Sequence, residues 1–173
     1  MPQISGLLCQ IITGKISGAG TDGDIFLGLC GREFVIDSKA DDFERGNWRE
    51  YILGDPPIPN GPTPSIQVNN PEFNDPRSEG FPLDSVNLDR SPVYLRFEPK
   101  DRDDNWNLAT AVILVYTNSF FKAFMPPSEF DNLWLGQKMG KVLFLTKEFV
   151  EGGDTPILKR VRELADKISK MPD

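Results

Sequence analysis

Three acidic loops that contain or adjoin small residues are the segments of this chain best suited to chemistry. They are Ser17–Asp24, Asp37–Asp42 and Asp101–Asn105, and each lies next to an apolar run. Crowded carboxylates repel one another unless a cation neutralises them, and Ca²⁺ is a hard cation that takes about 6–8 oxygen ligands. Glycines let main-chain carbonyls approach an ion without a Cβ in the way. The loops therefore indicate a calcium site, with plain hydration of acidic turns as the alternative.

An EF-hand is the first calcium motif to compare with the third loop. Asp101, Asp103 and Asn105 match the first three side-chain positions of its binding loop. The match then fails, because Trp106 stands where the motif needs glycine and Val112 stands where it needs glutamate. Any calcium site must instead be assembled from loops that are distant in sequence.

The composition excludes most enzyme classes. The 173 residues include no histidine, which removes Ser-His and Cys-His catalysis and imidazole zinc sites. Asp103 and Asp104 are paired carboxylates, but adjacent residues on an extended loop point apart, so acid–base catalysis by this pair is not expected. We therefore expect no enzymatic activity. With 19 Lys and Arg against 26 Asp and Glu, the net charge of −7 also opposes binding to nucleic acid.

The cysteines and the N-terminus bear on location. Cys9 and Cys30 each lie in an apolar run, which favours two buried, inert thiols over a disulfide. The first residues lack the basic and apolar regions of a signal peptide, and no run of about 18 apolar residues is present. The expectation is a cytoplasmic protein, not transmembrane, that can associate peripherally with membranes.

Short apolar runs bounded by Gly, Asn, Asp and Pro predict an antiparallel β protein. The expected strands are residues 7–13, 24–30, 33–36, 48–53, 93–97, 108–116 and 120–124. Nine of the fifteen prolines fall between Gly54 and Pro92, so this stretch is expected to be a long loop without a strand. Phe73 and Phe81 indicate that part of that loop is held in place.

A different unit is expected after Pro127. Residues 132–135 and 141–145 are apolar, and a helix is predicted over about 156–170, with Pro156 in its first turn. Its apolar stripe consists of Ile157, Leu158, Val161, Leu164, Ala165 and Ile168. Docking of this stripe on the sheet is preferred, with a membrane-surface or partner-binding helix as the alternative. The predicted division is therefore 1–125, with an insertion at 54–92, and an extension at 126–173.

The loops carry the motifs of a known family. The runs Gly18-Ala19-Gly20-Thr21-Asp22 and Asp42-Phe43-Glu44-Arg45-Gly46, with Trp106-Asn107-Leu108 downstream, resemble the PLAT/LH2 domain of lipoxygenases and lipases and the C-terminal domain of clostridial phospholipase toxins. The match covers residues 7–54 and 86–124. It implies an all-β fold, an antiparallel eight-stranded β-sandwich of PLAT/C2-like type, here with an appended C-terminal α-helix.

The resemblance also implies a metal site at one loop end of the sandwich. The residues that correspond to calcium ligands are Gly20, Thr21, Asp37, Asp41, Asp42, Asp104 and Asn105. Gly18 stands where the toxin-like members have an acidic residue, which predicts weak binding. Phe43 and Trp106 lie where the family packs its core, whereas Trp48, Trp134, Phe73 and Phe81 are the candidates for surface anchors.

Two functions follow as hypotheses. The first is a non-catalytic, calcium-dependent module that binds membrane lipids or a protein partner. The second is a structural or adaptor subunit that contacts another protein through the Pro-rich loop and the C-terminal helix, with calcium absent or purely structural.

Overall fold

The computed structural model describes residues 2–57, 65–127 and 132–148 together with positions 163 and 170. This part of the chain is all-β, as predicted, with one 3₁₀ turn at Ser85–Asp89. The strands are β1 (Ile4–Thr13), β2 (Asp24–Leu29), β3 (Arg32–Val35), β4 (Trp48–Gly54), β5 (Ser65–Gln67), β6 (Val93–Glu98), β7 (Asn105–Thr117), β8 (Phe121–Met125), β9 (Leu133–Gly136) and β10 (Val142–Glu148). No helix among the described residues is long and apolar enough to cross a membrane.

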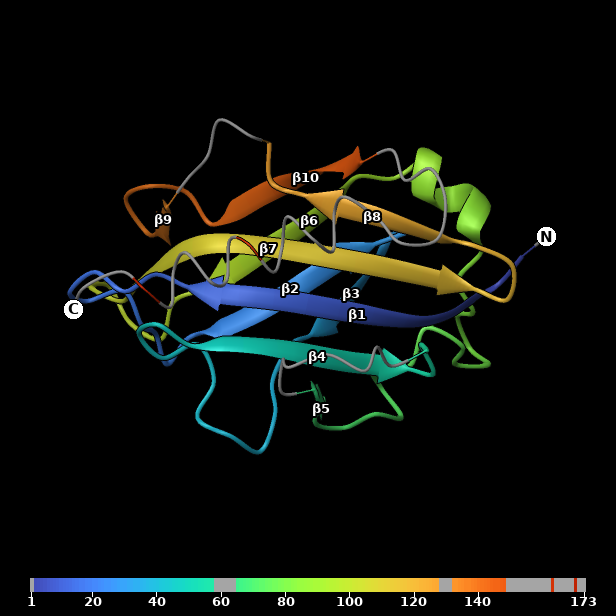
Figure 1. Ribbon diagram of the computed structural model, residues 1–173, viewed down its shortest axis with the longest axis horizontal. Helices are drawn as coiled ribbons and strands as arrows, with labels where there is room; N and C mark the ends of the chain where they lie inside the picture. Colours follow the sequence, from blue (N-terminus) through green and yellow to red (C-terminus); the bar gives the residue numbers. More distant parts are fainter. Residues whose placement is uncertain (1, 58–64, 128–131, 149–162, 164–169, 171–173) are drawn as a thin grey trace.

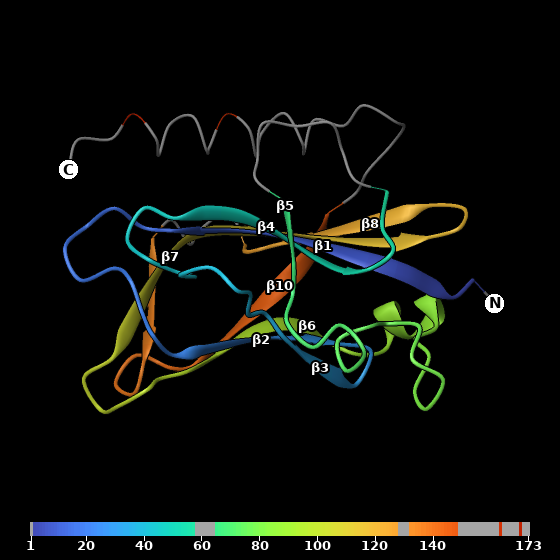
Figure 2. The ribbon, with the colours of Figure 1, turned by 90° about the horizontal axis from the view of Figure 1, so that it is seen from below.

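The strands form one hydrogen-bonded path that curls over itself. Their order is β3-β2-β6-β10-β8-β7-β1-β4-β5, and β9 pairs with β7. Figure 2 shows β4, β1, β7 and β8 in one layer and β3, β2 and β6 in a second layer facing it. Strand β10 joins the two, because its first half pairs with β6 and its second half with β8. The sequence predicted eight strands, whereas the described part of the chain has ten, nine on this path and β9 beside β7.

The main core lies between the two layers. Successive residues of a strand point to opposite faces, and Leu7, Cys9 and Ile11 of β1 meet Ile25 and Leu27 of β2 in this core. Cys9 and Cys30 are both buried free thiols, as expected from their apolar surroundings. Burial raises the pKa of Cys30 to about 11, so this thiol stays protonated and unreactive at neutral pH.

One feature of the outer segments differs from expectation. The Pro-rich stretch does contain a strand, since β5 pairs in parallel with β4 over Glu50↔Ser65 to Ile52↔Gln67. The three-residue strand begins after the last of the clustered prolines, where main-chain donors are again available. The strands after Pro127 pair within the main sheet and add Leu135, Leu143 and Leu145 to the core. The helix predicted over 156–170 lies outside the described residues.

The two ends of the molecule differ in character. The loops after β1, β3 and β6 are the three acidic loops, and they lie together on the left in Figure 1. The β2–β3 hairpin, the N-terminus and residues 70–83 of the Pro-rich loop lie at the other end. Arg32, at the start of β3, donates to the carbonyl oxygens of Phe73 (2.6 Å), Asp75 (2.8 Å) and Phe81 (3.4 Å). The acidic loops and the exposed Phe73 and Phe81 are therefore on opposite ends.

Candidate functional site: an acidic loop end

Main-chain hydrogen bonds hold the first two acidic loops against each other. The Gly46 amide donates to the Gly14 carbonyl at 2.9 Å, and the Thr21 amide donates to the Phe43 carbonyl at 3.3 Å. Gly46 has φ of +72°, which is a left-handed conformation that glycine adopts without steric cost. Phe43 adopts φ of +60° despite its side chain, and its ring packs in the core against Trp106 at a centroid distance of 5.6 Å. The Asp-Phe-x-Arg-Gly run thus serves to fix the loop backbone.

The third loop is tied to the first by a hydroxyl. Thr21 Oγ1 donates to Asp104, with its oxygen 2.7 and 2.9 Å from the two carboxylate oxygens. The Lys100 amide also donates to Asp104, at 2.8 Å. Beneath these loops the Trp106 indole donates to Thr13 Oγ1 at 3.0 Å, in a fully buried contact. The prediction that Phe43 and Trp106 belong to the core is confirmed by exposures of 5 % and 0 %.

Asp42 is the centre of a separate network inside the second loop. Its carboxylate accepts from the Ser38 amide (2.6 Å), the Ser38 hydroxyl (2.9 Å) and the Tyr51 hydroxyl (3.1 Å). It also forms an ion pair with Arg49 at 2.8 Å, and its side chain is only 5 % exposed. Burial and the Asp42 carboxylate together raise the pKa of Tyr51, which keeps its hydroxyl a donor. Both carboxylate oxygens of Asp42 are thus already used.

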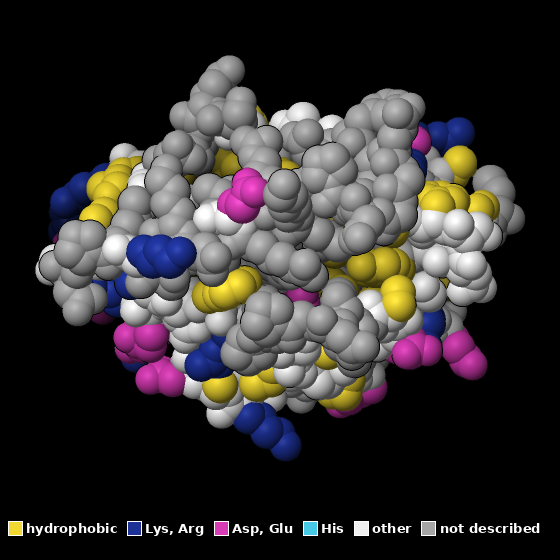
Figure 3. Space-filling view, viewed as in Figure 1, with side chains coloured by type: hydrophobic (Ala, Val, Ile, Leu, Met, Phe, Trp, Pro, Cys, Tyr) yellow, Lys and Arg dark blue, Asp and Glu magenta, His cyan; other side chains and the backbone are white. Residues whose placement is uncertain are grey.

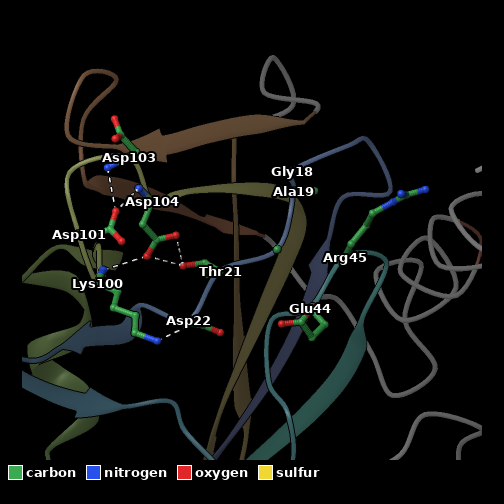
Figure 4. A pocket seen from close by; sticks show the side chains of 11 residues that line it. Gly18, Ala19, Thr21, Asp22, Glu44, Arg45, Lys100, Asp101, Asp103 and Asp104 are labelled. Atoms are coloured by element: carbon green, nitrogen blue, oxygen red, sulfur yellow. Dashed lines mark hydrogen bonds and ion pairs between the residues drawn. The ribbon is translucent and has the colours of Figure 1, made fainter.

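Two adjoining pockets open at this end of the molecule. The first has a volume of about 540 Å³ and is lined by residues of the first and third loops, with Glu44 and Arg45 on the opposite wall (Figure 4). The second, of about 300 Å³, lies between the first and second loops. Thr21, Asp22 and Lys100 line both pockets, so the two share a wall.

Lys100 supplies the positive charge at that shared wall. Its ammonium forms an ion pair with Asp22 at 2.8 Å, and this hydrogen-bonded contact raises the pKa of Lys100. Figure 4 shows the side chain reaching from the third loop to Asp22, below Asp104. Both side chains are more than 60 % exposed, at 62 % and 64 %, so the pair can open at little cost.

The second pocket holds carboxylates without a cationic partner. Continuing the β2–β3 register from Phe26↔Val35 places Asp24 opposite Asp37. Both are exposed, as is Asp41 on the same pocket. Among the described ion pairs none involves Asp24, Asp37 or Asp41. Like charges facing each other across a strand pair are destabilising, so this pocket carries unneutralised negative charge.

Most of the predicted site residues come together here. Gly20, Thr21 and Asp104 line the first pocket, and Thr21, Asp37, Asp41 and Asp42 line the second. Asn105 lines neither, and its amide donates to the Asp103 carbonyl at 2.8 Å. Asp22, Asp24 and Lys100 also line these pockets and were not among the predicted ligands. The alternation of β2 and β3 across their short hairpin would have identified the Asp24–Asp37 pair.

The oxygen atoms at this end of the molecule are of the kind that bind calcium, but they do not converge on one point. All available side-chain donors are oxygens, which a hard cation prefers. Within the described residues, however, no three acidic or cysteine side chains converge as a metal-binding group. Asp42 is committed to Ser38, Tyr51 and Arg49. The exposed carboxylates that line the second pocket are those of Asp22, Asp24, Asp37 and Asp41, of which Asp22 pairs with Lys100 and Asp37 accepts from the Asn69 side-chain amide at 2.7 Å. Binding at this place therefore requires exposed aspartates to move and Lys100 to withdraw from Asp22.

The candidate anchor residues divide between the two ends. Trp48 and Trp134 are half-buried at the acidic end, at the start of β4 and in β9. Phe73 and Phe81 are 72 % and 52 % exposed at the opposite end. On the face seen in Figure 3, basic and acidic side chains lie side by side at the acidic end. No aromatic side chain among the described residues is highly exposed beside the acidic pockets.

Comparison with known proteins places this fold beside two toxins. No sequence-family model matches the chain, and no curated protein matches it in sequence. The alpha-toxin of Clostridium absonum aligns with a TM-score of 0.52 and 17 % identity over 84 % of this chain and 32 % of the toxin. Alpha-toxin from an avian strain of Clostridium perfringens aligns with a TM-score of 0.50 and 16 % identity over 83 % of this chain and 31 % of the toxin.

Coral 8R-lipoxygenase aligns less closely, with a TM-score of 0.47 and 17 % identity over 94 % of this chain and 20 % of the enzyme. At such identities the toxin likeness shows the fold alone, and the chain spans about a third of the toxins' length. The predicted resemblance to a PLAT/LH2, C2-like domain is confirmed at the level of fold.

Proposed function

We propose that this chain is a non-catalytic binding module that attaches to lipid surfaces through its acidic loop end. The observation that carries the proposal is the second pocket, where Asp24, Asp37 and Asp41 lack a cationic partner. An anionic lipid surface repels such a cluster, so attachment requires a cation between the two. Bound calcium would supply that charge and would attract lipid phosphate at the same time.

The ligands that we propose are oxygens of the loops already brought together. From the predicted set we keep the main-chain oxygens near Gly20 and Thr21 and the carboxylates of Asp37 and Asp41. We add the carboxylates of Asp22 and Asp24. Asp42 and Asp104 act by positioning, because both carboxylate oxygens of each accept hydrogen bonds within the loops. Asn105 is left out of the proposed ligands because it lines neither pocket. The likeness of fold to alpha-toxins supports a membrane-directed module without assigning their activity to this chain.

Sedimentation with vesicles tests this function. Vesicles of phosphatidylserine and phosphatidylcholine should pellet the protein in millimolar Ca²⁺ and not in excess chelator. Asp37→Asn combined with Asp41→Asn should abolish pelleting, whereas Asp75→Asn at the opposite end should leave it unchanged. Binding that ignores both calcium and the Asp37/Asp41 change would refute the loop end as the attachment site.

One observation favours a protein partner as a second function. Phe73 and Phe81 are exposed, and Arg32 holds their carbonyls, so they form a fixed apolar surface on the Pro-rich loop. An adaptor role through this loop predicts that Phe73→Ser and Phe81→Ser remove a partner that co-purifies from the native host. The same changes should leave calcium-dependent pelleting intact, because the loop lies at the other end of the molecule.

A further inference from the structure

Exposed apolar side chains gather on the outer surface of the second layer, which is the lower layer in Figure 2. Cross-strand pairing aligns them with a few polar residues in two rows that run over β3, β2, β6 and β10. The first row consists of Val35, Phe26, Arg96 and Val142, and the second of Glu33, Gly28, Tyr94 and Phe144. We call these eight residues the outer patch.

The apolar members of the outer patch are open to solvent. Phe144 is 60 % exposed, Val142 is 43 % exposed and Val35 is 37 % exposed, while Phe26 and Tyr94 are half-buried. A sheet face that meets water normally carries polar residues in alternation with the buried ones. Contiguous exposed apolar side chains are instead typical of an interaction site.

The charged centre of the patch is already neutralised. The Arg96 guanidinium lies over the Phe26 ring, 4.0 Å from its centroid. It donates to both carboxylate oxygens of Glu33, at 2.8 and 2.9 Å, and to Glu98 at 3.0 Å. A partner therefore needs no charge of its own to match Arg96.

The aromatic part of the patch is held in place as well. The Tyr94 ring lies directly on the backbone of Gly28, where an added Cβ would come within 2.1 Å of the ring. Its hydroxyl donates to Glu33 at 3.1 Å, and its edge-to-face contact with Phe144 has a centroid distance of 6.1 Å. Tyrosine, phenylalanine and arginine are enriched at the centres of protein interfaces, and side chains that are fixed beforehand lose little entropy on binding.

The size of the patch indicates a small partner. Four strands about 4.8 Å apart and two rows about 7 Å apart cover about 250 Å² of sheet. Even doubled for the relief of the side chains, this area is below the roughly 800 Å² that each partner buries in a stable protein interface. A second copy of the chain or a large globular surface would need further contacts, whereas an extended segment of about five residues spans the four strands.

The border of the patch adds a preference for charge. Asp24 lies two residues before Phe26 on β2, so both side chains are on the same face. It is exposed and lies opposite Glu98, whose carboxylate pairs with Arg96 and Lys141. Among the described ion pairs none involves Asp24. A basic side chain is attracted to this border, and an acidic one is repelled.

We propose that the outer patch binds a short segment of a partner protein that carries aromatic or large aliphatic residues next to a lysine or arginine. The apolar side chains of the segment contact Phe144, Tyr94 and Val142, and its basic group reaches Asp24. This surface is separate from the Pro-rich loop of the adaptor hypothesis, which lies at one end of the molecule. It shares only Asp24 with the proposed calcium site.

Selection from a phage-displayed library of random heptapeptides, on the full-length chain in chelator, tests the proposal. Chelator keeps the outcome independent of calcium, so a failure here leaves the vesicle experiment unaffected. We expect the enriched peptides to combine an aromatic or large aliphatic residue with a lysine or arginine. Phe144→Ser should weaken the binding of their synthetic copies at least tenfold by fluorescence anisotropy. Phe120→Ser, at a 40 % exposed position between β7 and β8, is the matched control and should leave binding unchanged.

A second pair of variants tests the charged border. Asp24→Asn should weaken the same peptides about threefold, as expected for one exposed ion pair. Glu79→Gln removes an exposed carboxylate from the Pro-rich loop and should have no effect. Should Phe144→Ser lower the Tm, Val142→Ser gives the same comparison at a less central position.

Each other outcome overturns the proposal. A selection that enriches no peptide would mean that the patch does not bind such segments. Peptides that bind Phe144→Ser as tightly as the wild type would lie elsewhere on the chain. A dimer in sedimentation velocity that Phe144→Ser removes would make a second copy the occupant. Pelleting with vesicles in chelator that Phe144→Ser removes would assign the patch to a lipid surface instead.

Discussion

The Thr21 hydroxyl lies within hydrogen-bond distance of both carboxylate oxygens of Asp104, at 2.7 and 2.9 Å, although the two residues are 83 positions apart. This contact joins the loop before β2 to the loop before β7. The same hydroxyl accepts from the Gly23 amide at 2.8 Å, which closes the turn of the first loop. Thr21 thus links the backbone of one loop to the carboxylate of another.

Replacing that hydroxyl should loosen the loop end. Thr21→Val keeps the shape of the side chain but leaves Asp104 and the Gly23 amide without this partner. We expect the free energy of unfolding to fall by about 1–2 kcal/mol in urea titrations. Thr146→Val, at an exposed site on β10, should change it by less than about 0.5 kcal/mol. Equal values for the two variants would mean that the contact contributes nothing to stability.

Asp42 should act as a structural residue and not as a metal ligand. Asp42→Asn preserves the size of the side chain but removes the charge that pairs with Arg49, in a site where Asp42 is only 5 % exposed. Stability without calcium should fall by about 2–3 kcal/mol, since Arg49 then lacks its partner. Asp41→Asn, on an exposed neighbour, should leave stability almost unchanged. A Tm equal to the wild-type value for Asp42→Asn would contradict this role.

The sequence could predict the strands and the loops that meet, but not which carboxylates are available. Period-2 alternation places β2, β6 and β7 because burial on one face dictates the pattern. Asp42 and Asp41 look alike in sequence, yet only the fold brings Ser38, Tyr51 and Arg49 to Asp42. The strand β5 was missed because its partner, β4, is contributed by tertiary pairing and not by local propensity. Lys100 was missed because an ion pair across 78 positions leaves no local signal.

An ion pair on the outer surface of the second layer predicts that the stability of the protein depends on pH. Arg96 donates to both oxygens of Glu33, at 2.8 and 2.9 Å, and this hydrogen bonding holds the pKa of Glu33 below its ordinary value. A lowered pKa in the folded state means that the contribution to stability is present above the unfolded pKa, near pH 4.5. It is lost as the pH falls through the lower folded value.

Glu33→Gln checks that sign. The variant should be slightly less stable than the wild type at pH 7, and the two should converge as the pH falls below the lowered pKa of Glu33 in the folded state. The difference should stay below about 1 kcal/mol, because Glu33 is about a third exposed and solvent screens the pair. A gap that widens as the solution is acidified would show that another group dominates this region.

Lys100 should compete with calcium for the acidic end. Its ammonium pairs with Asp22 and lines both pockets, so a divalent cation must displace it or accept its repulsion. Lys100→Gln should strengthen calcium binding about tenfold, which corresponds to removing one positive charge about 6 Å from a divalent cation in a water-like dielectric. Lys141→Gln, whose ammonium pairs with Glu98 outside both pockets, is the matched control. Calorimetry that gives weaker binding for Lys100→Gln would place the ion elsewhere.

Variants of the facing pair Asp24 and Asp37 distinguish most sharply between a role in binding metal and a purely structural role. Without calcium these carboxylates repel each other, so Asp24→Asn combined with Asp37→Asn should raise stability by a few tenths of a kcal/mol. With calcium at about a hundredfold excess over Kd, the wild type should gain about 2.7 kcal/mol and the double variant almost nothing. A structural pair would instead show a loss of stability without calcium. Thermal unfolding in chelator measures the change in stability without calcium, and thermal unfolding in millimolar Ca²⁺ measures the gain from calcium. A calcium shift that is undiminished in the double variant would exclude these two residues as ligands.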